Sequence, residues 1–294
     1  MKKLSEQIKR VGLIANADKV SSRPLVRRAA SLIRASQRVV VTDAATAALA
    51  NLKAPTCPSP AALARQVDLL MVFGGDGTML RVARETAGSR TPFIGINVGS
   101  LGFLTDVQAH QLSLALKQIW AGETILESRS LIEAAARNSS NRIAETALND
   151  FVVSRGAAPR LIELEVMVDG ETLTRYRCDG LIVCTPTGST AYSLSAGGAV
   201  VSPRADVFTL TPICPHTLSN RSVIVSLDSI VRVKVLSERV DTFLTADGQK
   251  IIPLSTGEVV TIKRSRHSIR LLHLAGSSFF ETLRRKLNWS GSNI

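Results

Sequence analysis

The residues with the clearest potential for chemistry form the motif Gly74-Gly75-Asp76-Gly77-Thr78. Glycines allow backbone N–H groups to approach a phosphate closely, because no Cβ atom stands in the way. Asp76 is unusual in such a turn, since its carboxylate repels a phosphate. It could accept a proton from a hydroxyl group or help to hold a metal ion. A turn aspartate that only caps a helix is an equally good interpretation on local grounds.

The motif lies between a predicted strand and a predicted helix. The apolar run over residues 68–73 is bounded by turn residues, as in a buried parallel strand, and residues 79–86 have helical composition. Ligands of open α/β sheets bind at the carboxyl ends of strands, where a helix N-terminus adds partial positive charge. The glycine spacing matches neither the dinucleotide fingerprint nor the Walker A motif, which excludes an ordinary Rossmann or P-loop site.

A second group of polar residues occurs later in the chain. Asn149 and Asp150 follow a strand-like segment and could bind vicinal ribose hydroxyls, although a simple polar turn is the more common explanation of such a pair. Over residues 177–198 a buried strand runs into a loop rich in Gly, Ser and Thr. Such a loop offers many N–H and O–H donors to a phosphorylated or hydroxylated ligand, and Tyr192 offers a flat face for an aromatic base.

The first part of the chain predicts a Rossmann-like α/β domain with a mostly parallel sheet, because predicted strands alternate with predicted helices. The strands are expected over residues 10–16, 38–42, 68–73 and 92–97, and the helices over residues 21–35, 44–52 and 111–121.

The second part predicts an all-β, sandwich-like domain. From residue 124 onward the segments alternate with period two, and Asp169-Gly170 marks a tight hairpin. Two of its strands are expected over residues 259–263 and 268–273. A closing helix is expected near the C-terminus. The predicted domains are residues 1–122, residues 123–275, and a C-terminal helix and tail of residues 276–294.

The composition limits the cellular setting. The 294 residues are 45% hydrophobic and 20% charged, as in a globular protein with an ample core. No apolar run reaches the length of about 18 residues that a membrane span needs, and the N-terminus lacks the apolar region of a signal peptide. The four cysteines form no C-x-x-C pair, so they are expected to be reduced thiols of a cytoplasmic protein.

The net charge of +12 points to an anionic partner. Nucleic acid, a membrane surface and a polyanionic small molecule would all satisfy this charge. Aromatic residues make up only 4% of the chain, too few for a platform that stacks bases. We therefore expect small phosphorylated ligands, and neither nucleic acid nor a membrane, as partners.

The glycine motif resembles the phosphate-site motif shared by NAD kinases, diacylglycerol-type lipid kinases and, with a serine in last place, phosphofructokinases. Other stretches resemble the successive motifs of NAD kinases, in order. They are residues 95–104, Asn149-Asp150, residues 185–198, residues 212–219 and Asp247-Gly248-Gln249. The resemblance runs from about Val11 to Arg264, and by it the chain is identified as a bacterial-type member of the ATP-NAD kinase family.

The resemblance implies transfer of the ATP γ-phosphate to the 2′-hydroxyl of the adenosine ribose of NAD, with Mg²⁺ as the expected divalent metal. Asp76 would accept the hydroxyl proton, and the β-rich domain would bind NAD. No metal-ligating residue is assigned. The implied nucleotide-contact residues are Asp76, Gly77, Asn149, Asp150, Arg160, Arg177, Asp179, Thr190, Ala191, Tyr192, Ser193, Leu194, Ser195, Cys214 and Gln249. Family members are usually homodimers or homotetramers, so a homo-oligomer is expected.

The chain departs from the family pattern at a few positions. Asp150 stands where the family often has Glu, Ser222 where it commonly has Pro, and Cys214 where it often has a small residue. A lipid kinase or sugar kinase of the same superfamily is the alternative enzyme, and a polyanion-binding protein is the alternative outside enzymes. Formation of NADP from NAD and Mg-ATP separates these possibilities.

Overall fold

The computed structural model describes residues 4–99, 102–105, 107–137, 142–157, 159–216, 221–238 and 240–289. The chain divides into two compact units, one made of residues 1–128 and 269–294 and the other of residues 129–268. The chain therefore leaves the first unit near residue 128 and returns to it near residue 269. The domain limits expected at residues 122 and 275 remain predictions.

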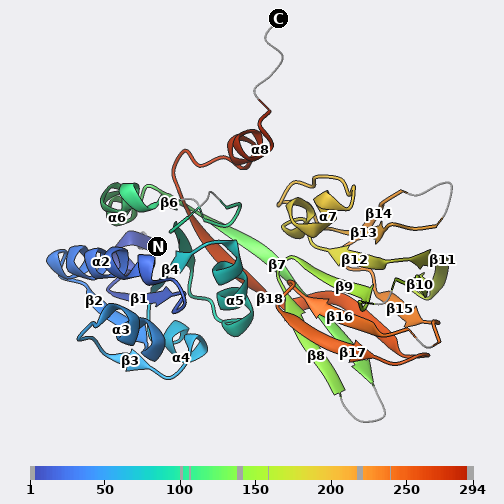
Figure 1. Cartoon of the computed structure of the whole chain (residues 1–294). Coiled ribbons are helices and arrows are strands. Elements are labelled where there is room, and N and C mark those ends of the chain that lie inside the picture. Colours follow the sequence, from blue (N-terminus) through green and yellow to red (C-terminus); the bar gives the residue numbers. More distant parts are fainter. Residues whose placement is uncertain are drawn as a thin grey trace, which may run out of the picture. The chain divides into compact units, whose positions relative to one another are not determined.

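The first unit is built around a parallel sheet, as the alternating pattern predicted (Figure 1). Its strands lie in the order β5-β4-β1-β2-β3. They are β1 (Arg10–Ala15), β2 (Val39–Asp43), β3 (Thr56–Cys57), β4 (Leu69–Gly74) and β5 (Phe93–Asn97), with β6 (Val107–Gln108) beside β5. The end of β18 (Val259–Leu274) also joins this sheet, since Leu271 pairs with Phe93 in parallel.

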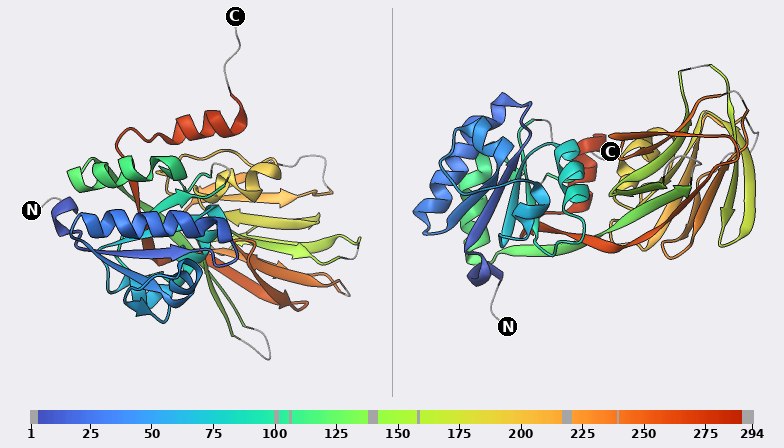
Figure 2. Two further views of the ribbon diagram at one scale, coloured as in Figure 1. Left: turned by 60° about the vertical axis from the view of Figure 1, so that its left-hand side comes forward. Right: turned by 90° about the horizontal axis from the view of Figure 1, so that it is seen from below.

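Helices cover both faces of this sheet (Figure 2). The helices before the second unit are α1 (Leu4–Gln7), α2 (Arg23–Ala35), α3 (Ala44–Ala50), α4 (Pro60–Ala64), α5 (Asp76–Glu85) and α6 (Leu112–Ala121), and α8 (Phe279–Leu287) follows the second unit near the C-terminus. Apolar residues of α2 and α6 pack in one cluster with alternate residues of the central strands, such as Leu69 and Met71. On the opposite face, the side chains of Leu63 and Val67 lie close to Gly12 of β1.

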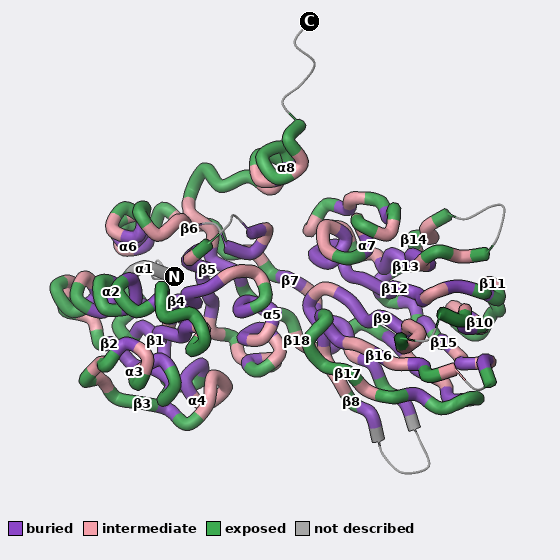
Figure 3. The backbone as a smooth tube through the Cα atoms, in the orientation of Figure 1, coloured by how far each residue is buried: buried purple, intermediate pink, exposed green. Residues whose placement is uncertain are grey.

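The central strand β4 matches the predicted strand over residues 68–73, and all six of its residues are buried (Figure 3). The following helix begins at Asp76, with Gly75 in an extended conformation as its N-cap. Asp76 and Gly77 therefore belong to the first turn of α5, earlier than the helical composition from residue 79 suggested. Short helix α4 lies in a proline-rich stretch, where Ser59 caps it through the N–H of Ala62.

The second unit is a sandwich of antiparallel strands. One sheet has the order β14-β13-β12-β9-β16-β17. It comprises β9 (Asp150–Arg155), β12 (Gly180–Cys184), β13 (Val207–Ile213), β14 (Val223–Ser226), β16 (Thr242–Ala246) and β17 (Lys250–Leu254). The other strands are β7 (Thr124–Arg137), β8 (Arg142–Ala147), β10 (Ile162–Val168), β11 (Glu171–Cys178), β15 (Val231–Val235) and β18 (Val259–Leu274).

A continuous apolar core joins the two layers of this sandwich. Phe151 and Phe208 from one layer and Leu164 and Val260 from the other lie in a single buried cluster. The structure corrects one sequence prediction, because residues 259–274 form one long strand, β18, in place of two. No helix among the described residues has the length and apolar character that crossing a membrane requires.

Candidate active site

Asp76 sits at the carboxyl end of β4, and a distant loop holds its carboxylate. The backbone N–H of Phe103 donates to Asp76 Oδ2 at 2.8 Å, and that of Leu104 donates to Oδ1 at 3.0 Å. A Cβ atom at Gly102 would lie 2.6 Å from Asp76 Cγ and 2.7 Å from Thr105 Oγ1, so only glycine permits this approach. The loop thus fixes the carboxylate and stabilises its negative charge.

The glycines of the first motif have different roles. A Cβ atom at Gly74 would collide with the side chain of Thr78, so close packing explains this glycine. Gly75 has an extended backbone that any residue can adopt, and a Cβ atom there would meet no described residue within 4 Å. Protein packing therefore does not require glycine at position 75. The open space next to its backbone suits the close approach of a ligand.

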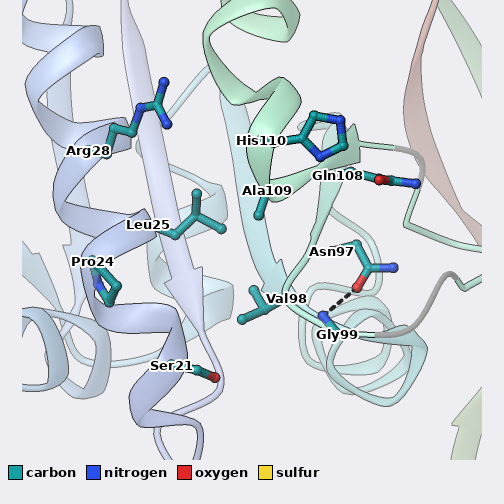
Figure 4. Close-up of a pocket in the computed structure, with 10 residues that line it drawn as sticks. All are labelled: Ser21, Pro24, Leu25, Arg28, Asn97, Val98, Gly99, Gln108, Ala109 and His110. Carbon is teal, nitrogen blue, oxygen red and sulfur yellow. Dashed lines mark hydrogen bonds between the residues drawn. The ribbon is translucent and has the colours of Figure 1, made fainter.

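A cavity of about 650 Å³ lies in the first unit near this turn (Figure 4). Its wall includes Asn97, whose Oδ1 accepts the N–H of Gly99 at 2.6 Å. Asn97 pairs with Gly74 across β5 and β4, so the cavity adjoins the glycine motif. The other lining residues are Ser21, Pro24, Leu25, Arg28, Val98, Gln108, Ala109 and His110. The volume and the mixed lining are those of a small-molecule site.

In the second unit, three separate sequence motifs meet at residues 148–150. Thr185 reaches this segment from one side: its N–H donates to the Asn149 carbonyl at 2.9 Å, and its hydroxyl donates to the Leu148 carbonyl at 2.7 Å. Asp247 binds the N–H groups of the same segment. A Cβ atom at Gly188 would overlap the Asn149 backbone, which explains that glycine. These three motifs, which are far apart along the chain, are therefore neighbours in space.

The loop after β12 folds into two short helical turns, Gly188–Thr190 and α7 (Tyr192–Ser195). Tyr192 and Ser195 are exposed, whereas Thr190, Ala191 and Leu194 are half-buried. Ser193 is buried, and its hydroxyl pairs with that of Thr211 at 2.9 Å. Tyr192 is 49% exposed and thus keeps the flat face that the sequence suggested for a base.

A further cluster forms where β9, β11 and β13 end and β12 begins. Arg155 donates from Nε to Asp179 Oδ1 at 2.5 Å, and the Asp179 N–H donates to the Ile213 carbonyl at 3.0 Å. Arg177 is exposed, and its carbonyl accepts the N–H of His216 at 2.8 Å. Cys214 follows Ile213 and is exposed with a positive φ of 44°. Sequence reasoning missed Arg155, since nothing in its local pattern marks it as the partner of Asp179.

Two further predicted residues lie in segments that connect strands. Arg160 is exposed in the segment before β10. The N–H of Gln249 donates to the Ala246 carbonyl at 2.9 Å, which closes the turn between β16 and β17. Parts of two family-like motifs, residues 100–101 and 217–219, lie outside the described residues.

Burial sets the ionisation of three groups near these motifs. Asp150 is only 4% exposed, and burial, followed by the charge of Asp247, raises its pKa to about 7. Burial raises the pKa of Cys178 and that of Cys184 to about 12, so both thiols stay protonated at neutral pH. Asp150 is therefore the group of this cluster that changes charge near neutrality.

Two family models match most of the chain. The model described as the ATP-NAD kinase N-terminal domain matches residues 11–124, and the ATP-NAD kinase C-terminal domain matches residues 148–274. A protein of Moorella thermoacetica named NAD kinase is 40% identical over 293 residues, which cover 97% of this chain and 91% of that protein.

Two solved structures share the fold over nearly the whole chain. Yeast NADH kinase complexed with NADH has a TM-score of 0.87 and 27% identity, covering 98% of this chain and 89% of its own. An NAD kinase from Archaeoglobus fulgidus in complex with ATP has a TM-score of 0.76 and 28% identity, covering 96% of this chain and 100% of its own.

Proposed function

Because this chain belongs to the ATP-NAD kinase family and is an NAD kinase that uses ATP, we propose that Asp76 accepts the proton of the hydroxyl group that is phosphorylated. The acceptor is the 2′-hydroxyl of the adenosine ribose of NAD. Its oxygen forms a bond to the γ-phosphorus of ATP, the bond from that phosphorus to the β–γ bridging oxygen breaks, and ADP leaves with the electron pair. The hydroxyl proton passes to the Asp76 carboxylate.

The hydrogen bonds of Asp76 are the observation that carries this proposal. The N–H groups of Phe103 and Leu104 hold both oxygens in place, yet each carboxylate oxygen has a second lone pair that can accept a hydroxyl proton. A fixed acceptor contributes through orientation, and general-base assistance is typically worth about 10²–10⁴ in rate. This arrangement supports a catalytic role for an aspartate inside the proposed phosphate-binding turn.

The glycine turn is proposed to bind the phosphates of ATP. Open space beside Gly75 lets its backbone approach an anion, and the N-terminus of α5 adds a partial positive charge. The adjoining cavity lined by Asn97 is the proposed place for other parts of a nucleotide. Phosphoryl transfer depends mostly on such positioning and charge neutralisation.

A divalent metal, Mg²⁺, is proposed to accompany ATP and to neutralise phosphate charge during transfer. Mg²⁺ commonly binds through one or two carboxylates together with substrate phosphates. Among the described residues, no group of three or more His, Cys, Asp and Glu side chains forms a site for a metal ion. We therefore assign no ligand residue and derive no step through the metal.

The second unit is proposed to recognise NAD. Asn149 and Asp150 would bind ribose hydroxyls, and the turn that carries Tyr192 would bind the adenine. Arg177 and Asp179 would lie near the nicotinamide half, with Asp179 held by Arg155. The remaining proposed contacts are Gly77, Arg160, Thr190, Ala191, Ser193, Leu194, Ser195, Cys214 and Gln249. Convergence of three motifs on residues 148–150 supports this assignment.

The chain is also proposed to form a homodimer or homotetramer. Both edge strands of the six-stranded sheet expose a large apolar side chain, Ile224 of β14 at 52% and Ile251 of β17 at 69%. Such edges are common sites of association. Light scattering coupled to size-exclusion chromatography measures the mass; a monomer at micromolar concentration would contradict the proposal.

The direct test is an assay of the purified protein with Mg-ATP and NAD, in which an NADP-dependent dehydrogenase detects the product. We expect the wild-type protein to form NADP and the Asp76→Asn variant to lose most turnover. Phosphorylation of a lipid or a sugar in place of NAD would overturn the assignment of the substrate.

A further inference from the structure

Asp247 makes an unusual set of hydrogen bonds to the segment that carries Asn149 and Asp150. Its Oδ1 accepts the N–H of Asn149 at 2.8 Å, that of Leu148 at 3.2 Å and that of Asp150 at 3.4 Å. Its Oδ2 also accepts the N–H of Leu148 at 3.2 Å. One carboxylate therefore binds three consecutive backbone N–H groups that lie 97–99 residues away in the sequence.

The contact runs in both directions. The backbone N–H of Asp247 donates to the carbonyl of Asp150 at 3.0 Å. Asp247 is 8% exposed and has a φ of 50°, the left-handed conformation that aspartate tolerates in an Asp-Gly turn. The turn between β16 and β17 is thus joined to the start of β9 through side chain and backbone together.

We propose that Asp247 is a positioning residue for NAD recognition, whose carboxylate fixes the backbone of residues 148–150 so that Asn149 and Asp150 can bind the substrate. This inference rests on the proposed role of that pair. The opposite side of the segment is fixed by Thr185 through the carbonyls of Leu148 and Asn149. Thr185 thus binds carbonyl groups of this segment, and Asp247 binds its N–H groups.

The charge of Asp247 has a second effect on the same pair. Asp150 is buried, and burial and then the Asp247 charge raise its pKa to about 7. Among the described residues, Cys184 also faces Asp150, as its neighbour in the β9–β12 register, and it stays neutral because burial raises its pKa to about 12. The ionised carboxylate accepts hydrogen bonds from two hydroxyls more strongly than the protonated form, because both of its oxygens are charged and neither carries a proton. NAD binding should therefore weaken as the pH falls through about 7.

The test compares two aspartates in matched Asp-Gly turns. Asp169 also has a positive φ, of 52°, and also accepts a backbone N–H, that of Ile230 at 2.8 Å, but it lies in the β10–β11 hairpin. Asp247→Asn and Asp169→Asn remove one charge each from the same kind of turn. For both variants and the wild type, KM for NAD and kcat are measured from about pH 5.5 to 9, and circular dichroism reports folding.

For Asp247→Asn we expect KM for NAD to rise about tenfold to hundredfold, the effect of weakening a charge-assisted hydrogen bond. We expect a smaller change in kcat. The pH at which KM begins to rise should move to lower pH, because one of the two causes that raise the pKa of Asp150 is removed. Asp169→Asn should keep the wild-type KM and pH profile. A folded Asp247→Asn variant with wild-type KM and profile would overturn the proposal.

A second variant, Asp150→Asn, leaves Asp247 unaltered. It tests the link between the charge of Asp150 and the pH dependence of NAD binding. Its KM for NAD should be high and independent of pH near neutrality, whereas persistence of the wild-type pH dependence would overturn the link. This substitution remains decisive where Asp247→Asn does not fold. Failure of the proposed function is distinguishable from these results, since the wild-type protein would then form no NADP at any pH.

Discussion

Replacing Gly102 by alanine tests whether the loop of residues 102–105 holds the Asp76 carboxylate in position. The added Cβ atom would lie 2.6 Å from Asp76 Cγ and 2.7 Å from Thr105 Oγ1, closer than real Cβ contacts come. Either the carboxylate rotates or the loop shifts, and both changes disturb the N–H bonds from Phe103 and Leu104. A hydrogen bond to a charged group contributes about 1.5–3 kcal/mol. Loss of either bond therefore lets the carboxylate leave the orientation in which it can accept the hydroxyl proton.

This displacement of the Asp76 carboxylate lowers the rate, because a shift of about 1 Å can cost about 10² in rate. We therefore expect kcat of Gly102→Ala to fall by about 10² or more. NAD affinity, measured by isothermal titration calorimetry, should change little. The matched control is Gly12→Ala, where the new Cβ atom would lie 2.6 Å from Leu70 Cδ2 in the core of the same unit. It should lower the melting temperature while leaving kcat of the folded protein unchanged. A Gly102→Ala enzyme with wild-type kcat would refute the role of the loop.

Three further predictions concern stability, NAD binding and the metal. In the folded protein the pKa of Asp150 is raised from 3.8 to about 7. Its contribution to the free energy of unfolding is therefore complete below about pH 4 and is lost as the pH rises to about 7. At about 1.4 kcal/mol per pH unit, wild-type stability should fall by roughly 3 kcal/mol from pH 5 to 8 through this group. Asp150→Asn should lack that fall in urea denaturation, and equal pH slopes would contradict the shift. Arg155→Leu should raise the dissociation constant for NAD about tenfold by freeing Asp179, at little cost in kcat; unchanged titrations would remove Arg155 from the site. A chelator should abolish NADP formation and added Mg²⁺ should restore it, whereas full activity in the chelator would exclude a required divalent metal.

The sequence predicted those parts of the fold that depend on local patterns. A short apolar run that ends in glycines predicts a buried strand and a turn, and β4 with its turn confirms it. The strand β18 shows the limit of this reasoning. Its apolar alternation is interrupted by residues 263–267, which are mostly basic, so two strands were expected. Ion pairs of Lys263 with Glu133 and of Arg264 with Asp206 and Asp228 accommodate those charges in one continuous strand.

The partners of the site residues could not be predicted in the same way. Asp76 is 27 and 28 residues from its two N–H donors, and Arg155 is 24 residues from Asp179. Asp247 is almost 100 residues from the segment that it binds. Such pairs depend on the order of strands in a sheet, which local composition does not specify. The proposed site residues were predicted from motifs, whereas their hydrogen-bond partners required the structure.

The central claim is that Asp76 receives the hydroxyl proton, and the Asp76→Asn variant tests it most directly. Asparagine keeps the size of the side chain and can still accept one N–H bond, but it cannot take up a proton at neutral pH. Single-turnover phosphoryl transfer from Mg-ATP and the dissociation constant for NAD are measured on the same preparation. We predict a loss of about 10²–10⁴ in the transfer rate with nearly unchanged NAD affinity. Transfer at the wild-type rate would contradict the assignment of Asp76.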